Sequence, residues 1–281
     1  MTIYISPNPG KTSASEIALR AAQILLTHGA AVLMSDALRE SCNTAGVIYL
    51  PLERCLKRAD VILTIGGDGT ILHEANLSLR YAKPILGINL GRCGFLATCE
   101  VAELPTKLQR LAAEEFTLVN RGLLHAEVPA HGWRADAIND IVLFGQTRLH
   151  PMDYKVYCDG AFVGSYRSDG MILATPTGST AYSFSAGGPI LDVSADVMVL
   201  TPVCAHNVYV APLVFAASRR LEIIADAENR DGSFACADSS DQCDLLPGER
   251  LCITGGGQGL QLIAFDDAEQ FHAIENKLMR R

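Results

Sequence analysis

Apolar and polar residues recur with two different periods along the first part of the chain. Short apolar runs of strand length alternate with segments that carry an apolar residue every three to four positions, as an amphipathic helix does. Strands that alternate with helices are typical of a parallel sheet, so we expect an α/β domain over residues 1–117. The pattern predicts strands at 2–6, 31–34, 46–50, 61–65 and 84–89, and helices at 13–28, 53–58, 70–81 and 105–113.

After Phe116 the helical period mostly disappears and short strands follow one another. Asp159-Gly160 separates two of them and is a strong signal for a two-residue hairpin. We therefore expect a β-rich second domain over residues 118–265. The predicted strands are 123–128, 135–144, 154–158, 162–166, 171–174, 197–203, 221–225 and 250–254.

The last segment, residues 266–281, returns to a helical period. Phe271, Ile274 and Leu278 have the spacing of one helix face. We expect a C-terminal helix that packs back on the first domain.

Composition narrows the class of protein. With 49% hydrophobic and 19% charged residues, the 281-residue chain can bury sizeable cores. A formal charge of -8 argues against a broad nucleic-acid surface. The nine cysteines are odd in number and form no C-x-x-C pair, and in a chain of this size we expect them to be reduced thiols of a cytoplasmic protein. We expect no signal peptide, no transmembrane segment and no membrane partner.

The stretch Gly66-Gly67-Asp68-Gly69-Thr70 lies where a predicted strand gives way to a predicted helix. Glycine allows the backbone to approach another backbone or a phosphate closely, and amides at a helix start favour anions. A carboxylate there makes sense if Asp68 handles a proton or a metal beside a phosphate. Asp is also a good helix N-cap, and the turn alone leaves both interpretations open.

Gly10-Lys11-Thr12, after the first strand, resembles the end of a Walker A motif. That motif needs a glycine five positions before Gly10, where this chain has Ile5. We therefore interpret this stretch as a turn in which Ser13 or a neighbour caps the next helix.

Two polar stretches stand out in the β-rich part. Asn139 and Asp140 interrupt a predicted strand, and since successive strand residues face opposite ways, a bulge, an edge strand or a ligand contact would explain them. In the stretch 167–189, a strand leads into a loop rich in Gly, Ser and Thr and then a short helix near Ser179. Its hydroxyls, amides and the ring of Tyr182 suit an adenine and a ribose. Asp169-Gly170 within it could equally form a plain hairpin turn.

Taken together, these stretches resemble the NAD kinase family. The G-G-D-G-T loop is shared with diacylglycerol and sphingosine kinases, but the run N-x-G-x-x-G-F-L at 89–96, the Asn-acidic pair at 139–140 and the signature D-G-x-x-x-x-T-P-T-G-S-T-A-Y-S-x-S-A-G-G-P at 169–189 match NAD kinases. The resemblance extends from Thr2 to about Phe265. It implies a bacterial-type NAD kinase, with an α/β domain followed by a β-sandwich-like domain.

The resemblance also implies a reaction and its residues. The terminal phosphoryl of ATP, or of polyphosphate, is transferred to the 2′-hydroxyl of the adenosine ribose of NAD. Asp68 would be the catalytic residue, and Mg²⁺ or another divalent cation would bridge the phosphates without protein ligands of its own. We expect a homodimer or homotetramer. The expected substrate-binding residues are Gly67, Gly69, Thr70, His73, Asn139, Asp140, Arg167, Asp169, Thr180, Ala181, Tyr182, Ser183 and Ser185.

Two features depart from the family or remain ambiguous. Asp238-Ser239-Ser240 stands where the family usually has Asp-Gly-Gln, and Gly255 to Gly259 is interpreted as a hairpin loop.

A lipid kinase with the same glycine loop is an alternative function, but the acidic chain lacks the basic cluster that a membrane-facing surface would need. A non-catalytic NAD(P)-binding regulator is another, and the intact Asp68 argues against it.

Overall fold

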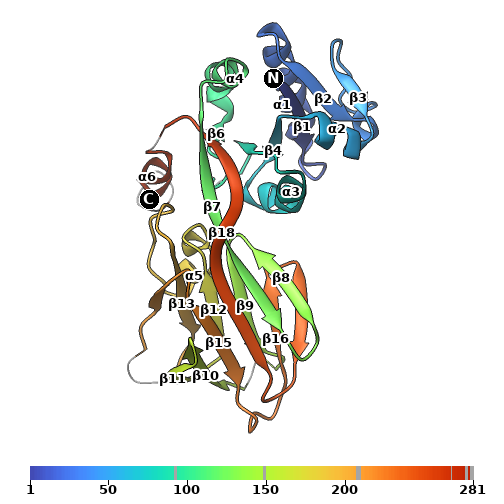
Figure 1. Cartoon of the computed structure of the whole chain (residues 1–281). Coiled ribbons are helices and arrows are strands. Elements are labelled where there is room, and N and C mark those ends of the chain that lie inside the picture. The colour runs from blue at the N-terminus through green and yellow to red at the C-terminus, as the bar shows by residue number, and fades with distance from the viewer. Residues whose placement is uncertain (92–93, 148–149, 207–209, 267, 276–277, 279–281) are drawn as a thin grey trace. The chain divides into compact units, whose positions relative to one another are not determined.

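The computed structural model describes residues 1–91, 94–147, 150–206, 210–266, 268–275 and 278 of the chain (Figure 1). The chain divides into two compact units, unit 1 with residues 1–120 and 260–281, and unit 2 with residues 121–259. Two long strands, β7 (Thr117–Val128) and β18 (Arg250–Ala264), contribute residues to both units. Whether these units are also the functional domains stays a prediction.

Unit 1 is built on a parallel sheet. Its strands lie in the order β18-β5-β4-β1-β2-β3, and β4 is buried along its whole length, as the apolar run predicted. The order places β1 next to β4, although β2 and β3 come between them in the chain. The strands of this sheet are β1 (Thr2–Pro7), β2 (Ala31–Ser35), β3 (Ile48–Leu50), β4 (Val61–Gly66), β5 (Ile85–Asn89) and the short β6 (Cys99–Glu100), which pairs with β5.

Four helices of the α/β pattern accompany this sheet: α1 (Thr12–Thr27), α2 (Leu52–Arg58), α3 (Asp68–Tyr81) and α4 (Leu104–Ala112). One face of α1 packs on the core of unit 1: Ile17, Ala21 and Leu25 are buried there, and Ile24 is half-buried against it. Helix α3 begins at Asp68, two residues before the predicted start, so the glycine turn is shorter than expected.

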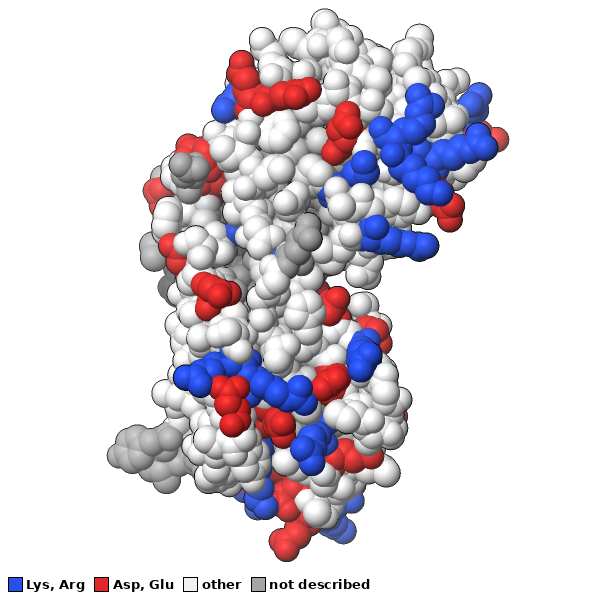
Figure 2. Space-filling view, viewed as in Figure 1, with Lys and Arg blue, Asp and Glu red and all other residues white. Residues whose placement is uncertain are grey.

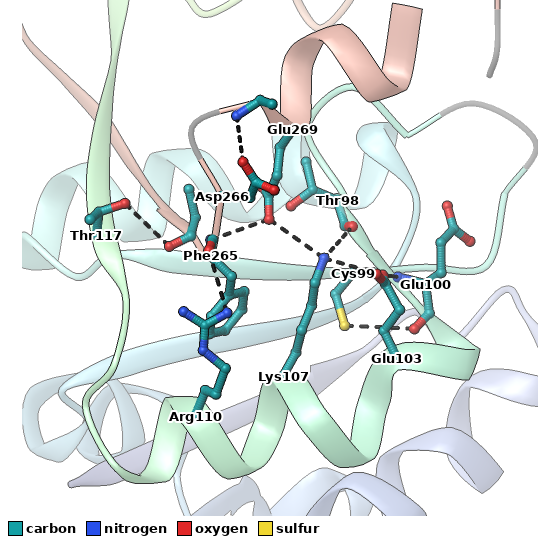
Figure 3. Close-up of polar contacts among 12 residues, drawn as sticks. Thr98, Cys99, Glu100, Glu103, Lys107, Arg110, Thr117, Phe265, Asp266 and Glu269 are labelled. Carbon is teal, nitrogen blue, oxygen red and sulfur yellow. Dashed lines mark hydrogen bonds and ion pairs between the residues drawn. The ribbon is translucent and has the colours of Figure 1, made fainter. Parts of the chain in front are cut away.

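The C-terminal segment lies against α4 within unit 1 (Figure 3). Lys107 Nζ donates to the carbonyl of Thr98 at 3.0 Å and lies 3.5 Å from Glu269 Oε1, at the start of α6 (Glu269–Ile274). Arg110 donates to the carbonyl of Phe265, and both cations lie over the Phe265 ring. Half-buried ion pairs and cation–π contacts of this kind fix the segment to the helix.

Unit 2 consists of two antiparallel sheets with a shared apolar core. One has the order β11-β10-β15-β18, with β7 pairing β18 and β8; the other has the order β14-β13-β12-β9-β16-β17. The strands not yet named are β8 (Trp133–Ala137), β9 (Asp140–Gly145), β10 (Met152–Cys158), β11 (Ala161–Ser168), β12 (Gly170–Ala174), β13 (Val197–Val203), β14 (Leu213–Ala216), β15 (Arg220–Ala225), β16 (Ser233–Ala237) and β17 (Asp241–Leu245). The predicted fold class, an α/β domain with a parallel sheet followed by a β-rich sandwich-like domain, is confirmed.

Strand β7 begins six residues before the predicted start at 123, and two other predicted features were wrong. The single strand at 135–144 is two strands, β8 and β9, which belong to different sheets and are separated by Ile138 and Asn139. The glycines at 255–259 form no hairpin loop and lie inside β18. A Cβ on Gly259 would lie 1.8 Å from the carbonyl oxygen of Arg121, so the glycine there permits close approach of a neighbouring backbone.

The two Asp-Gly pairs of unit 2 differ. Asp159 and Gly160 have φ of 49° and 81° and form the predicted hairpin turn between β10 and β11. Asp169, by contrast, connects β11 of one sheet to β12 of the other, so the plain hairpin considered for Asp169-Gly170 was wrong.

Charged side chains are unevenly distributed on the face shown in Figure 2: Lys and Arg gather over α2 and α3 of unit 1, whereas both signs are interspersed over unit 2. Every cysteine at a described position is a free thiol. Within the described ranges, no helix is both long and apolar enough to cross a bilayer.

Candidate functional site

The glycine turn of unit 1 joins β4 to α3. A Cβ on Gly66 would lie 2.0 Å from Thr70 Oγ1, so only glycine fits there. The amide of Gly67 donates to Thr70 Oγ1 at 3.3 Å, and the amide of Thr70 donates to the carbonyl of Gly67 at 2.9 Å. The amides of Asp68 and Gly69 have no acceptor among the described residues. These two amides, at the positive end of α3, are therefore free to bind an anion.

The carboxylate of Asp68 does not cap its own helix. It accepts three consecutive backbone amides of the loop after β5: Phe95 on Oδ2 at 3.0 Å, and Leu96 and Ala97 on Oδ1 at 3.0 and 2.9 Å. The N-cap position belongs to Gly67, so the N-cap interpretation of Asp68 was wrong. A carboxylate offers about four lone-pair sites, so one site, on Oδ2, stays available after these three bonds.

The loop that Asp68 holds contains the end of the N-x-G-x-x-G-F-L stretch, Phe95 and Leu96, and the next residue, Ala97. Asn89 fixes its start, since its side chain accepts the amide of Gly91 at 2.8 Å and donates to Glu100 at 3.0 Å. Arg92 and Cys93 of this stretch lie outside the described residues. His73, predicted as a substrate contact, is exposed on α3.

The turn that resembled a Walker A ending lies beside the glycine turn. Lys11 occupies the N-cap position of α1, and no side chain caps that helix, so the expected cap from Ser13 or a neighbour was wrong. Lys11 Nζ instead donates to the carbonyl of Gly66 at 3.3 Å. The side chain of Asn8 donates to Thr70 Oγ1 at 2.9 Å and links the two turns.

In unit 2 a second aspartate holds the corner between β8 and β9. The carboxylate of Asp238 accepts the amides of Ile138, Asn139 and Asp140 at 2.7, 2.9 and 3.2 Å. Asp140 is 6% exposed. Burial, together with the nearby charge of Asp238, raises the pKa of Asp140 from 3.8 to about 7. The polar interruption that the sequence showed is thus a break between two strands, stabilised by a distant carboxylate.

The carbonyl of Asn139 also contacts the loop that begins at Thr175, within the signature stretch 169–189. The amide of Thr175 donates to its carbonyl at 2.9 Å, and a Cβ on Gly178 would lie 2.0 Å from the same oxygen. Gly178 is therefore required for the loop to pass this corner. Asn139 is thereby in contact with the loop that leads into the Thr180–Ser185 stretch, and Asp140 pairs with Ala174 just before that loop.

A cavity of about 840 Å³ opens beside this stretch within unit 2. Phe144 stacks on Tyr182, with ring centroids 6.0 Å apart and planes 10° apart, and on Phe234 at 6.4 Å. Tyr182 is 45% exposed, so one face of this aromatic row is accessible to a ring-shaped ligand. The cavity is lined by Val142, Phe144, Gly145, Gln146, Thr147, His150, Asp169, Tyr182, Val203, Phe234, Cys236 and Ser239.

The other predicted residues of unit 2 have different surroundings. Ser183 is fully buried and its hydroxyl is 2.8 Å from Thr201 Oγ1, which makes it a structural residue. Thr180 donates to the carbonyl of Thr177, while Ser185 is exposed and Ala181 is half-buried. Arg167 is exposed and lies 3.3 Å from Asp153.

Sequence reasoning missed several residues of this arrangement. Phe144 and Phe234 occupy strand positions that resemble ordinary core positions, and nothing in the sequence pairs them with Tyr182. Asp238 was noted only for the serine that follows it. The amides of 95–97 carry no side-chain signal at all, because the peptide backbone is what Asp68 binds.

Comparison with known families identifies the protein family to which this chain belongs. Residues 3–116 match the family model described as the ATP-NAD kinase N-terminal domain, and residues 138–265 match the ATP-NAD kinase C-terminal domain. This chain belongs to the NAD kinase family. The family predicted from the glycine turn and the signature stretch is therefore confirmed, as is the enzyme class of an NAD kinase.

Curated NAD kinases are similar over most of this chain. The NAD kinase of Pseudomonas fluorescens (strain SBW25) is 31% identical over 272 residues, which is 96% of this chain and 92% of the relative. The NAD kinase of Tolumonas auensis is 34% identical over 238 residues, 81% of each chain. These matches support the NAD kinase interpretation over the lipid kinase and the non-catalytic regulator.

Solved structures agree with the fold. A yeast NADH kinase complexed with NADH aligns with a TM-score of 0.86 and 25% identity, covering 99% of this chain and 87% of that one. An Archaeoglobus fulgidus NAD kinase in complex with ATP aligns with a TM-score of 0.74 and 24% identity, covering 98% and 99%. The second likeness concerns the fold alone.

Proposed function

We propose that this NAD kinase family member transfers the terminal phosphoryl of ATP to the 2′-hydroxyl of the adenosine ribose of NAD and so makes NADP. The observation that carries the assignment is the glycine turn, where two free helix amides lie beside a carboxylate with one spare lone pair. An anionic phosphoryl donor and a hydroxyl acceptor are the two groups that such a turn suits.

The donor phosphates are assigned to the amides of Asp68 and Gly69. The sequence had also suggested Gly67 and Thr70, but their amides are already paired inside the turn. Gly67 and Thr70 therefore shape the turn, while Asp68 and Gly69 supply the donors. Helix-end amides bind phosphate through direct hydrogen bonds and the positive end of the helix dipole.

Asp68 is assigned to the hydroxyl. The free lone pair on Oδ2 accepts the hydrogen bond of the 2′-hydroxyl and orients its oxygen toward the terminal phosphorus. As the new oxygen–phosphorus bond forms and the bond to the bridging oxygen breaks, ADP leaves and the hydroxyl proton passes to the carboxylate. A carboxylate is a weak base for an alcohol, so it accepts the proton late, and most of its contribution is positioning.

The dinucleotide is assigned to unit 2. Tyr182, supported by Phe144, offers a ring face for the adenine, and Asp169 lines the same cavity. Asn139 and Asp140 remain candidates for the ribose hydroxyls, and Arg167 for a phosphate. Thr180, Ala181 and Ser185 are close to Tyr182 in the chain and remain candidates, whereas Ser183 is assigned to holding the segment against Thr201.

A divalent cation fits this turn as part of the donor. Within the described part of the chain, no three His, Cys, Asp or Glu side chains are grouped to hold a metal. Mg²⁺ held by the donor phosphates would neutralise charge that develops during transfer. The expectation that the metal has no protein ligands of its own stays a prediction.

An assay with purified protein tests the assignment. Incubation with ATP, Mg²⁺ and NAD should form NADP, and parallel reactions with inorganic polyphosphate as the donor determine donor choice. Diacylglycerol and sphingosine in place of NAD should remain unphosphorylated. Measurable NAD binding without NADP formation across several metals and donors would contradict the proposal and favour a regulator. The cytoplasmic location and the homodimer or homotetramer are likewise proposals, and sedimentation of the protein tests the latter.

A further inference from the structure

Lys11 brings an ammonium group to the glycine turn. Its Nζ donates to the carbonyl of Gly66, and a Cβ on Gly67 would lie 3.7 Å from it. The side chain is half-buried, and within the described ranges no carboxylate lies within ion-pair distance of it. A lysine ammonium has three donors, so two remain after the bond to Gly66.

The turn that carries Lys11 is fastened to the glycine turn at several points. The amide of Asn8 donates to the carbonyl of Ile65 at 2.9 Å, and its side chain donates to Thr70 Oγ1 at 2.9 Å. The amide of Lys11 in turn donates to the carbonyl of Asn8 at 3.1 Å. These bonds fix the backbone of Lys11 relative to the glycine turn and the two free amides of α3. The position of the ammonium group therefore depends on several hydrogen bonds and not on the Lys11 side chain alone.

The topology of the sheet independently points to a ligand at this place. From β1 the chain continues to β2 and β3 on one side, and later to β4 and β5 on the other. The strand order therefore reverses between β1 and β4. In open parallel sheets, ligands bind in the crevice outside the carboxyl ends of the strands at such a reversal. Lys11 follows β1 there, and the glycine turn follows β4.

We propose that the Lys11 ammonium is a direct ligand of the phosphate chain of the phosphoryl donor. The inference rests on the proposed function for the identity of the donor, and it adds a cation to a site otherwise made of amides. Because the contact is to phosphate oxygens, it applies equally to the triphosphate of ATP and to inorganic polyphosphate. The lysine acts on a polyanion as a point charge, which is how lysine commonly binds phosphate.

Two substitutions separate the charge of Lys11 from its structural bond. Lys11→Gln keeps a side-chain N–H that reaches toward the carbonyl of Gly66 but removes the charge. Lys11→Arg keeps the charge. The matched control is Lys57→Gln, an exposed lysine in the last turn of α2. All three full-length proteins are compared with the unmodified chain by melting temperature, by titration with ATP and with inorganic tripolyphosphate without NAD, and by steady-state kinetics.

Lys11→Gln should weaken binding of tripolyphosphate and raise the KM for ATP by roughly 10- to 100-fold, the usual worth of a charge-assisted hydrogen bond. The KM for NAD and the melting temperature should change little. Lys11→Arg should recover most of the loss, and Lys57→Gln should behave like the unmodified protein.

The outcomes separate this inference from the proposed function. If Lys11→Gln binds tripolyphosphate and ATP within two- to threefold of the unmodified protein, the inference is overturned even though NADP is made. A melting temperature that falls while both affinities hold would overturn it in favour of a structural lysine. If the protein makes no NADP but binds tripolyphosphate in a Lys11-dependent way, the proposed function fails and the phosphate contact stands.

Discussion

Asp68 in unit 1 and Asp238 in unit 2 each bind a backbone segment in the same way, but their surroundings differ. Each carboxylate accepts three consecutive amides of a distant segment, 95–97 for Asp68 and 138–140 for Asp238. Asp68 is half-exposed at the start of a helix, beside amides that are free. Asp238 is in a tight turn, and its charge lies near the buried carboxyl of Asp140.

The comparison shows that three backbone amide bonds alone do not distinguish Asp238 from Asp68, the residue proposed to be catalytic. What separates them is the space around the remaining lone pair and the charge next to it. Beside Asp68 the free groups are hydrogen-bond donors, so an anionic substrate is favoured there. The charge of Asp238 acts on another acid, Asp140, and burial raises the pKa of Asp238 although three amide bonds act to lower it.

The largest expected effect comes from Asp68→Asn. The amide oxygen of Asn can replace only part of the acceptors, and its NH₂ group faces backbone N–H groups. Turnover should fall by roughly 100- to 10,000-fold, the usual range for a positioned acid–base group. The free energy of unfolding should also fall, by about 1–3 kcal/mol, because amides of 95–97 lose their acceptor. Single-turnover kinetics and denaturant unfolding measure the two losses.

Two further variants serve as controls for Asp68→Asn. Asp238→Asn removes the same three-amide anchor and should show a comparable loss of stability but a far smaller loss of turnover per NAD bound. Asp169→Asn should weaken NAD binding as well as turnover, as expected for a residue that lines the cavity. An Asp68→Asn enzyme that turns over within a few-fold of the unmodified protein would sink the mechanism and make the two aspartates equivalent.

The next largest effect is a pH dependence that Asp140 confers on stability. Its pKa is about 7 in the folded protein and near 3.8 when unfolded, so the folded state holds the extra proton between these values. Stability from this group is therefore complete below about pH 4 and is lost as the pH rises through 7. Three pKa units correspond to at most about 4 kcal/mol.

Asp140→Asn mimics the protonated carboxyl and should remove this dependence. The variant should match the unmodified protein near pH 4 and exceed its stability increasingly up to pH 8, as measured by urea unfolding at a series of pH values. A stability difference that stays constant across this range would mean that Asp140 is ionised in the folded protein throughout, and that the charge of Asp238 is not felt there.

The smallest expected effect concerns the turn that contains Asp238 and Ser239. Asp238 and Ser239 both have positive φ, 43° and 59°, a region that glycine adopts without strain. Ser239→Gly should relieve strain, partly offset by the greater freedom of glycine in the unfolded chain, for a net gain below about 1 kcal/mol. Thermal unfolding tests this, and catalytic efficiency should stay within a few-fold. A tenfold rise in efficiency would show that the native turn limits catalysis and that Ser239 faces the substrate.

Much of the fold was predictable because buried strands and helix faces give apolar residues a regular spacing along the sequence. Fully buried β4 is a plain apolar run, and the face of α1 is visible as Ile17, Ala21 and Leu25. Strands with small or polar residues left no such record: β16 reads Ser-Phe-Ala-Cys-Ala and β17 reads Asp-Gln-Cys-Asp-Leu. The glycines of β18 were misread as a loop because glycine signals both a turn and the close approach of another strand, and only the position of Arg121 distinguishes them.

The candidate site was predictable only where a motif carried it. The glycine turn and the signature stretch pointed to Asp68, Asp169 and Tyr182, but the partners of these residues are backbone amides and rings on distant strands. Contacts of that kind depend on three-dimensional proximity and not on local sequence. For the same reason Lys11 looked like the remnant of an incomplete motif, since its bond partner, Gly66, is in another turn.

The two anchors also differ in how much chain each must close. Asp68 is separated by 27 to 29 residues from the amides it binds, which follow it in the chain, whereas Asp238 is separated by 98 to 100 residues from the amides that precede it. Each doubling of a closed loop adds about 0.6 kcal/mol of entropic cost, so the second closure starts from a disadvantage of roughly 1 kcal/mol. During synthesis on the ribosome, the corner at 138–140 must wait until Asp238 has emerged. Pulse-labelled hydrogen exchange during refolding should accordingly find the amides of 95–97 protected before those of 138–140.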